Sequence, residues 1–151
     1  MQEVYLFEIQ KDFAFSNVPS PVFIPPKEIL SIFQGLRATL RNRELAFDET
    51  YLDLAEALDV PPYKGDKLKE LENIYLPLEQ LVRAKVIRDP AGIFYFEPQK
   101  NEVVQNITLH KRIHAQIAAE GHRKIGMLSY LIKNGSLKKG SSLFWDEPEA
   151  N

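Results

Sequence analysis

The sequence contains no cysteine among its 151 residues, and this absence excludes several kinds of site. Without thiols the chain has no disulfide framework, no cysteine nucleophile and no zinc site built on cysteine. A chain that lacks cysteine fits a reducing compartment, so we expect the protein to be cytoplasmic.

Long hydrophobic runs are also lacking. No apolar stretch approaches the roughly 20 residues that a helix needs to span a bilayer. The opening residues MQEVYLFEIQKD have no basic n-region and include Glu3, Glu8 and Asp12, unlike a signal peptide. These features predict a soluble protein without membrane contact.

Sequence motifs of the common enzyme classes are missing. The chain has no GxGxxG, no phosphate-binding loop and no GxSxG. Its carboxylates, as at Glu70, Glu72 and Glu79, recur at the spacing of a solvated helix surface. We therefore expect a non-enzymatic protein with no cofactor.

No metal site is expected either. His110 and His114 have the i, i+4 spacing that lets two ligands share an ion on one helix face. Zinc needs three or four protein ligands, and only Glu102, Glu120 and His122 lie nearby in sequence. We expect the histidines to extend a basic surface when they are protonated.

What the chain does contain is enough apolar material for a core. Hydrophobic residues make up 44% of the chain and aromatic residues 11%, which is too many for a disordered protein. The length predicts one domain with or without an appendage. We divide it into a domain over residues 1–100, a basic helical extension over 101–134 and a flexible acidic tail over 135–151.

The net charge of −2 conceals a split along the chain. Residues 107–140 carry seven basic residues against one acid, whereas residues 1–106 have a balance of −5 and residues 141–151 one of −3. Such asymmetry indicates a polyanion-binding segment followed by an acidic tail. The alternative is a solvated helix face without such a partner.

The first half of the domain reads as strands followed by helices. Residues 1–26 are expected to be extended, because Pro21, Pro25 and Pro26 forbid a helix across residues 22–24. A second helix should follow Thr50 and end at Pro61. Before it, a first helix is expected from about Pro26, with an apolar stripe of Ile29, Phe33, Leu36 and Leu40.

A third helix is predicted from Asp66 to Val82. Pro77 lies inside it, removes one backbone donor and should kink or divide it. We expect this helix to complete the core by contacts of Leu71, Leu78 and Leu81 with Phe33, Leu36 and Leu54.

The clearest local signal follows this helix. The β-branched and aromatic runs at residues 86–87 and 93–96 favour strands. Between them, Asp89-Pro90-Ala91-Gly92 has the residue types of a type I turn. The sequence therefore predicts an antiparallel hairpin with its turn at Asp89–Gly92.

Two more helices are predicted at the C-terminal side, from about Asn101 to Ala119 and from about His122 to Lys133. Asn134-Gly135 should end the second of them. The glycine, serine and acid of residues 135–151 predict a mobile tail.

The order strand, helix, helix, helix, hairpin over residues 22–98 resembles the winged helix-turn-helix superfamily. YLDLAEALDV resembles the second helix of that family, and KLKELENIYLPLEQLVRAKVI resembles its third helix running into the wing. Leu76-Pro77-Leu78 is similar to winged-helix domains of plasmid and phage replication initiators. The resemblance implies an α+β fold with a three-helix core, a β-hairpin wing, N-terminal extended strands and a helical C-terminal extension.

The resemblance also implies DNA binding, in transcription regulation or in replication and plasmid or phage maintenance. The third helix of a winged helix enters the major groove, where lysine donates to phosphate or guanine and asparagine pairs with adenine. The candidates near this helix and at the wing tip are Lys64, Lys67, Lys69, Asn73 and Arg88.

The basic segment supplies a second set of candidates for DNA contacts, which would act on the phosphate backbone. These are Lys111, Arg112, Arg123, Lys124, Lys138 and Lys139. The alternative is that its helices pack on the domain or on a second subunit through Ile113, Ile117, Ile125, Leu128 and Ile132. Winged-helix proteins of similar layout often dimerise through an added C-terminal helix.

The tail suggests a protein partner instead. Leu143, Phe144 and Trp145 precede three acids and could dock into another protein, or fold back onto their own chain. The second function to consider is therefore a non-enzymatic protein–protein interaction adaptor or inhibitor. Lysines 64, 67 and 69 on the same side as the cations of residues 107–140 would favour DNA, and opposite sides would favour the adaptor.

Overall fold

The computed structural model describes residues 19–33, 36, 39, 49–99, 103–104, 107–108 and 112–146. Its elements are β1 (Val22–Ile24), α2 (Glu49–Asp59), α3 (Asp66–Lys69), α4 (Glu72–Leu81), β2 (Ala84–Arg88), β3 (Phe94–Pro98), β4 (Val103–Val104), β5 (Ile107–Thr108), β6 (Ile113–His114), the 3₁₀ helix η2 (Ala115–Ile117), α5 (Glu120–Lys133) and β7 (Leu143–Trp145). The chain is an α+β protein, as the sequence predicts. No helix within the described ranges is both long and apolar enough to cross a membrane.

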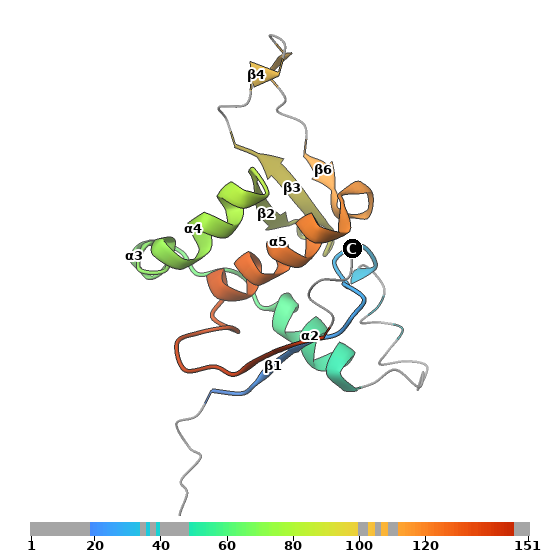
Figure 1. The fold of residues 1–151 in the computed structure, drawn as a ribbon, viewed down its shortest axis with the longest axis vertical. Helices are drawn as coiled ribbons and strands as arrows, with labels where there is room; N and C mark the ends of the chain where they lie inside the picture. Colours follow the sequence, from blue (N-terminus) through green and yellow to red (C-terminus); the bar gives the residue numbers. More distant parts are fainter. Residues whose placement is uncertain are drawn as a thin grey trace, which may run out of the picture.

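Helix α5 runs through the middle of the molecule, beside the three-stranded sheet β2-β3-β6 and between helices α4 and α2 (Figure 1). Residues 126–133 of α5 are all buried. A Cβ atom on Gly126 would lie 2.5 Å from Val86 Cγ2 and 2.8 Å from the Phe96 ring. The missing side chain of Gly126 therefore sets how closely α5 approaches the sheet.

An aromatic cluster joins the sheet to the helices. The Phe94 ring packs edge-to-face against Phe33 and Tyr130, with ring centroids 5.0 Å apart in both pairs. Each such pair contributes roughly 0.5–1.5 kcal/mol beyond the area it buries. Burial raises the pKa of the Tyr130 hydroxyl, so this side chain stays protonated in the core.

The predicted hairpin is confirmed. Strands β2 and β3 pair antiparallel out to Arg88 and Phe94. The Gly92 amide donates to the Asp89 carbonyl at 3.0 Å, and the Asp89 carboxylate accepts from the Ile93 amide at 2.8 Å. The side chain and the backbone of Asp89 thus close the turn together, which explains why this local signal was sufficient.

The N-terminal prediction holds in part. Val22–Ile24 is extended as expected, whereas residues 26–32 form bends and turns and the first helical residue is Phe33. The predicted helix start near Pro26 is therefore too early. Glu28 accounts for the delay, because its carboxylate accepts hydrogen bonds from the Ser31 amide at 3.2 Å and the Ser31 hydroxyl at 2.7 Å.

The third predicted helix is divided, but not where the sequence indicates. The break lies at residues 70–71, between α3 and α4, and Pro77 is inside α4. Pro77 is exposed, and so is Asn73, whose carbonyl the missing N–H would have bonded. Water can satisfy that carbonyl, so the helix tolerates the proline.

The residues that the third helix was predicted to contact are buried, namely Phe33, Leu36 and Leu54. The helix presents a different face to them. Leu81 is 69% exposed and Leu71 and Leu78 are half-buried, so the predicted burial of Leu81 is wrong. The buried face of α4 consists of Tyr75, Glu79 and Val82. A helical pattern predicts that leucine is buried and glutamate is exposed, whereas here Glu79 is buried and Leu81 is exposed.

The predicted helix over residues 101–119 is wrong. Residues 103–104 and 107–108 form the short pair β4-β5, and β6 adds to β3 with Phe96 opposite Ile113. The isoleucines and valines of this region have helical spacing, but β-branched residues also suit strands, and β3 offers an edge for pairing. Helix α5 then starts at Glu120, two residues before the predicted start.

The segment predicted as a mobile tail forms strand β7, which pairs parallel to β1 (Figure 1). Phe23 lies opposite Phe144 and Ile24 opposite Trp145. The Asp146 amide donates to the Ile24 carbonyl at 2.9 Å. Residues 143–145 are thus part of a sheet, and residues 147–151 lie outside the described part of the chain.

Hydrogen bonds of the turn after α5 connect this C-terminal segment to the end of α2. The Asn134 side-chain amide donates to the carbonyls of Ala57 at 2.8 Å and Val60 at 3.0 Å. Gly135 has φ +78° and leaves room for Tyr63, whose hydroxyl a Cβ would meet at 2.1 Å. With α5 packed on α2, α4 and β2, the predicted extension over residues 101–134 contributes to the core itself.

Adjacent residues of α4 allow a test of which face is buried. We expect Val82→Ala to cost about 1–3 kcal/mol in unfolding free energy, because Val82 is buried and the change removes two methyl groups. The matched control, Leu81→Ala, should cost less than about 0.5 kcal/mol because its side chain is exposed. Urea unfolding measures both, and a larger loss for Leu81 would contradict this orientation.

Candidate interaction surface

Most cations of the C-terminal basic segment form ion pairs within the fold. The pairs, with their N–O distances, are Arg123–Glu28 at 2.5 Å, Lys124–Glu120 at 3.7 Å, Lys133–Glu79 at 2.6 Å and Arg112–Glu97 at 3.3 Å. The cations of the first three pairs are largely buried, whereas Arg112 is exposed. Arg123 and Lys124 are therefore removed from the candidate DNA surface, and Lys111 lies outside the described residues.

The Glu79–Lys133 pair joins three elements in the core. Lys133 Nζ on α5 donates to Glu79 Oε1 on α4 at 2.6 Å and to the Val86 carbonyl of β2 at 2.9 Å. It also lies 5.7 Å from the centre of the Tyr75 ring, whose pKa is raised by burial and by the nearby Glu72 and Glu79 carboxylates. The buried ammonium is thus satisfied on several sides, as a buried charge requires.

Arg88 and Arg123 both form hydrogen bonds that connect separate segments of the fold. Arg88 was predicted at the wing tip, but its guanidinium donates to Asp59 at 2.7 Å and to the Leu58 carbonyl at 3.3 Å, at the end of α2. Arg123 donates to the Ala115 carbonyl at 3.4 Å and to that of Ala118, which holds η2 against α5. This placement also withdraws Arg88 from the candidate DNA contacts.

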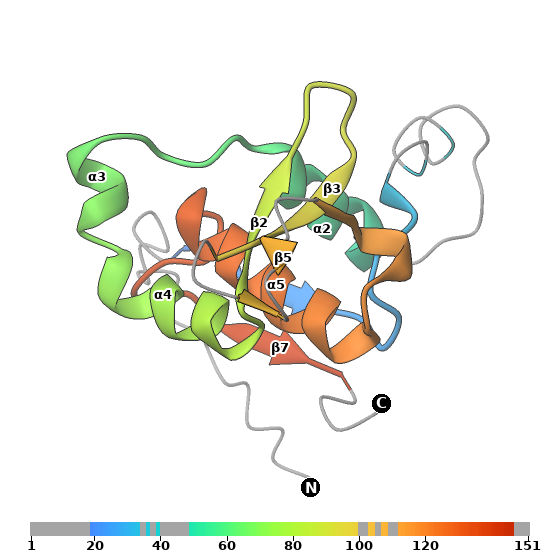
Figure 2. The ribbon, with the colours of Figure 1, turned by 90° about the horizontal axis from the view of Figure 1, so that it is seen from above.

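Six predicted DNA contacts remain exposed cations: Lys64, Lys67, Lys69, Arg112, Lys138 and Lys139. Arg112 is paired with Glu97 of β3. Helix α3 and the loop after α5 lie at the same end of the molecule (Figures 1 and 2), and the Tyr63 amide donates to the Lys133 carbonyl at 2.8 Å. Lys67 Nζ sits 3.7 Å from the centre of the Tyr63 ring, and Lys69 pairs with Asp66 at 3.1 Å. The lysines are thus interspersed with acids and an aromatic ring.

The outward face of α4 carries no cation. Within Glu72–Leu81 there is no lysine or arginine, and the exposed side chains beyond the first residue are Asn73, Ile74, Pro77, Gln80 and Leu81. Ile74 is 53% exposed and Leu81 69%. Asn73, the predicted adenine reader, therefore stands beside an apolar stripe with helical spacing rather than beside a basic one.

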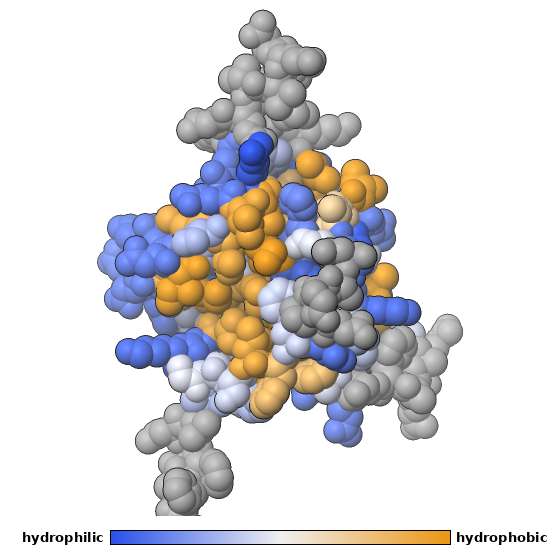
Figure 3. Space-filling model, viewed as in Figure 1, coloured by the Kyte–Doolittle hydropathy of each residue, from blue (hydrophilic) through white to orange (hydrophobic). Residues whose placement is uncertain are grey.

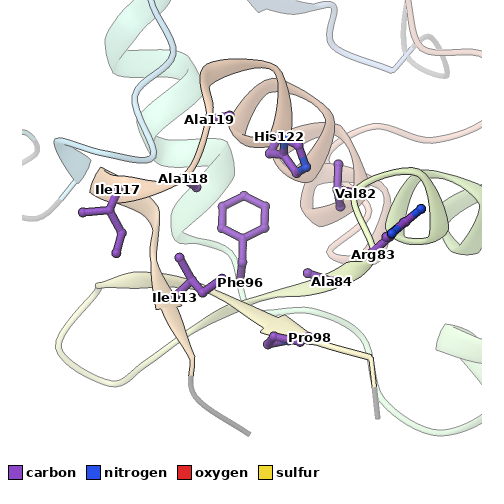
Figure 4. Close-up of a pocket in the computed structure, with 10 residues that line it drawn as sticks. All are labelled: Val82, Arg83, Ala84, Phe96, Pro98, Ile113, Ile117, Ala118, Ala119 and His122. Atoms are coloured by element: carbon purple, nitrogen blue, oxygen red, sulfur yellow. The ribbon is translucent and has the colours of Figure 1, made fainter. Parts of the chain in front are cut away.

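An apolar pocket of about 350 Å³ opens at the C-terminal end of this helix (Figure 4). It is lined by Val82, Arg83, Ala84, Phe96, Pro98, Ile113, Ile117, Ala118, Ala119 and His122. The Phe96 side chain points into it from β3, with Ile113 and Ile117 to one side and Val82 to the other. Five elements and two connecting segments thus build one hollow.

Two exposed isoleucines lie at the rim of the pocket. Ile117 is 77% exposed and Ile113 41% exposed. Figure 3 shows apolar residues gathered over the region of α4 and α5, and again at the position of η2. Isolated exposed apolar residues are ordinary, but exposed apolar residues at the rim of a hollow are typical of a binding surface. We refer to Ile74, Pro77, Leu81, Ile113 and Ile117, with the pocket, as the docking face.

The charge of the pocket has one sign. None of the ten lining residues is acidic, and Arg83 and His122 are basic. Arg83 is the one residue other than glycine with a positive φ among the described residues, at +52°, directly after the C-cap of α4. Glycine is the usual residue in that conformation, so an arginine there carries a backbone cost of order 1 kcal/mol.

The predicted partner-binding tail lies on its own domain. Trp145 is partly buried and packs against the core, while Phe144 and Leu143 are exposed along β7. The fold-back alternative therefore describes these residues. Sequence reasoning missed the pocket because its residues come from four separate stretches, and the isoleucines 113 and 117 were assigned to a helix face.

Potential metal ligands do not cluster in the described part of the chain. No three histidine, cysteine, aspartate or glutamate side chains gather there as metal ligands. His114 Nδ1 instead accepts a hydrogen bond from the Gln116 amide at 3.1 Å, and its ring packs on Tyr95. His110 lies outside the described residues.

The buried ion pair predicts an unequal double-mutant cycle. Glu79→Leu and Lys133→Met should each cost about 3–5 kcal/mol in unfolding free energy, because each leaves a buried charge alone. The double variant should cost less than either single variant, although the Val86 carbonyl then loses its donor. Urea unfolding tests this, with the exposed pair Glu97→Ala and Arg112→Ala as the control, expected below about 1 kcal/mol. Additive losses at Glu79 and Lys133 would contradict a coupled pair.

Comparison with protein-family models, with curated proteins and with solved structures gives no match for this chain. The winged-helix resemblance therefore stays a prediction, and function has to be argued from the docking face and the exposed charges themselves.

Proposed function

We propose that this protein is a non-enzymatic protein–protein interaction module that binds a partner protein through the docking face. The observation that carries the proposal is the outward face of α4, which has exposed Ile74, Pro77 and Leu81 and no cation. An apolar helix face beside a hollow suits a protein partner, because apolar burial drives such association. It does not suit a phosphate backbone, which requires lysine and arginine.

The electrostatic basis for DNA binding is weaker in three dimensions than in sequence. The balance of +6 over residues 107–140 includes Arg123, Lys124 and Lys133, all of which are buried or paired inside the fold. Such charges release no counterions from DNA. Asp66, Glu70 and Glu72 are exposed in and beside α3 and would repel phosphate.

DNA binding remains the second candidate, because one observation favours it. The exposed lysines of α3 and of the loop after α5 lie at one end of the molecule, which was the arrangement expected of a DNA-binding surface. In this proposal the fold is a winged helix with a regulatory or replication role, and the helix α4 followed by the hairpin supports it. A cytoplasmic location, proposed from the lack of cysteine, fits both functions.

Photo-crosslinking at defined positions tests the proposed function. A photoreactive amino acid at Leu81 or at Ile117 should capture the same protein in cells, because both residues belong to the docking face. The control position is Lys139, which is exposed in the loop after α5 and does not belong to the docking face. Adding Ile74→Asp to the Leu81 reporter should reduce capture at least tenfold without unfolding the protein, since Ile74 is exposed.

A binding assay with duplex DNA supplies the contrary outcome. If DNA were the partner, replacing Lys64, Lys67, Lys69, Lys138 and Lys139 by glutamine would flatten the slope of log K against log salt by about four units. We expect the parent protein to show no such salt-dependent binding. A steep slope together with capture at Lys139 alone would refute the protein-interaction proposal.

A further inference from the structure

We propose that the pocket at the end of α4 binds a partner segment in which an apolar side chain is followed by an acidic residue. This inference rests on the proposed function and deepens it by naming the chemistry of the partner. The apolar side chain would enter the hollow above Phe96, and the carboxylate would lie toward Arg83 and His122.

The apolar half of the proposal follows from the lining. Eight of the ten lining residues are apolar, and the cavity of about 350 Å³ is large enough for one leucine or phenylalanine side chain. Phe96 and Val82 are buried beneath it, so the base of the hollow is part of the core and is fixed in place. Burial of one such side chain strengthens binding roughly 10- to 100-fold.

The acidic half follows from charge complementarity. Arg83 and His122 are both exposed and both line the pocket, from α4's end and from α5. A guanidinium binds carboxylates through a planar fork, and an imidazole can donate a hydrogen bond in either protonation state. None of the ten described lining residues is acidic, so a basic segment would meet two like groups in the pocket.

A second copy of this chain is the alternative occupant. Aromatic residues stand directly before an acid at Phe7, Phe47, Phe96 and Trp145. Phe96 is itself buried in the pocket lining, and Trp145 packs on the core of its own molecule from β7, which is paired with β1. Phe7 and Phe47 lie outside the described residues. Because the proposed function is binding of a partner protein, we commit to a separate protein as the source of the segment, and self-crosslinking tests the second copy.

Short peptides test the proposal directly. The probe is acetyl-Gly-Ser-Phe-Asp-Ser-Gly-amide, titrated into the isotope-labelled full chain and followed by NMR. We expect amide shifts to concentrate at Ala84, Ile113, Ile117 and Ala118. Replacing aspartate by asparagine should weaken binding about fivefold, because it removes the charge-assisted hydrogen bond. Replacing phenylalanine by alanine should weaken it at least tenfold, and a Phe-Lys peptide should also bind at least tenfold more weakly.

Arg83→Gly separates binding from stability. Glycine adopts φ +52° without strain, so the variant keeps the backbone of this turn, and a cooperative thermal unfolding transition checks that it is folded. The preference for aspartate over asparagine should fall to below about twofold. The matched control is Lys85→Gln, which removes one exposed positive charge two residues away and outside the pocket lining. It should leave the preference unchanged.

The outcomes distinguish this inference from the proposed function. Equal binding of the Phe-Asp and Phe-Lys peptides, shifts confined to Lys138 and Lys139, or no shifts at all would overturn the inference. If crosslinking at Leu81 and Ile117 then still captured one protein, the interaction module would stand with a different ligand chemistry. Self-crosslinking at Ile117, with a dimer in solution, would show that a second copy occupies the docking face and would also overturn the inference.

Discussion

The ion pair between Glu79 and Lys133 is the interaction on which the packing of α4, α5 and the hairpin depends. Two charges removed from water destabilise a fold unless each is paired and hydrogen-bonded. Lys133 meets this condition by bonding Glu79 at 2.6 Å and the Val86 carbonyl at 2.9 Å. In the hairpin, the Gln99 amide donates to the Arg83 carbonyl and the Asp89 amide donates to the Ile93 carbonyl. Residues that bond to the opposite strand alternate along an antiparallel pair, so the Val86 carbonyl points away from β3, toward the outer edge of β2. One lysine thus neutralises a buried acid and closes a strand edge.

The same principle decides how the chain uses its other charges. Arg88 holds the hairpin to the end of α2, and Arg123 joins Glu28 to the segment before α5. These cations stabilise contacts between distant segments and are not available to a polyanion. A charge total along a sequence counts them as if they were exposed. The functional consequence is a molecule whose basic C-terminal segment serves the fold, while the surface of α4 is apolar.

The docking face is therefore a product of the packing that places Glu79 inside. When Tyr75, Glu79 and Val82 face the core, Ile74, Pro77 and Leu81 must face outward, because they lie on the opposite side of the helix. The exposed isoleucines of β6 and η2 line the pocket at the C-terminal end of this helix. An interaction module explains these exposed residues, and the basic rim of the pocket explains which partner chemistry they would select.

The sequence by itself determined the α+β class, the helices α2 and α5, and the hairpin, whose turn depends on neighbouring residues from Asp89 to Ile93. It did not determine the β6 strand or β7, because each forms only against a partner strand, β3 or β1. The sequence also predicted a DNA-binding surface that includes Arg88, Arg123 and Lys124, although these side chains form ion pairs within the fold. Glu79 and Lys133 are 54 positions apart, and only the tertiary structure brings them together. Local chemistry fixes turns and helix patterns, whereas burial of a charge depends on partners that the chain supplies from a distance.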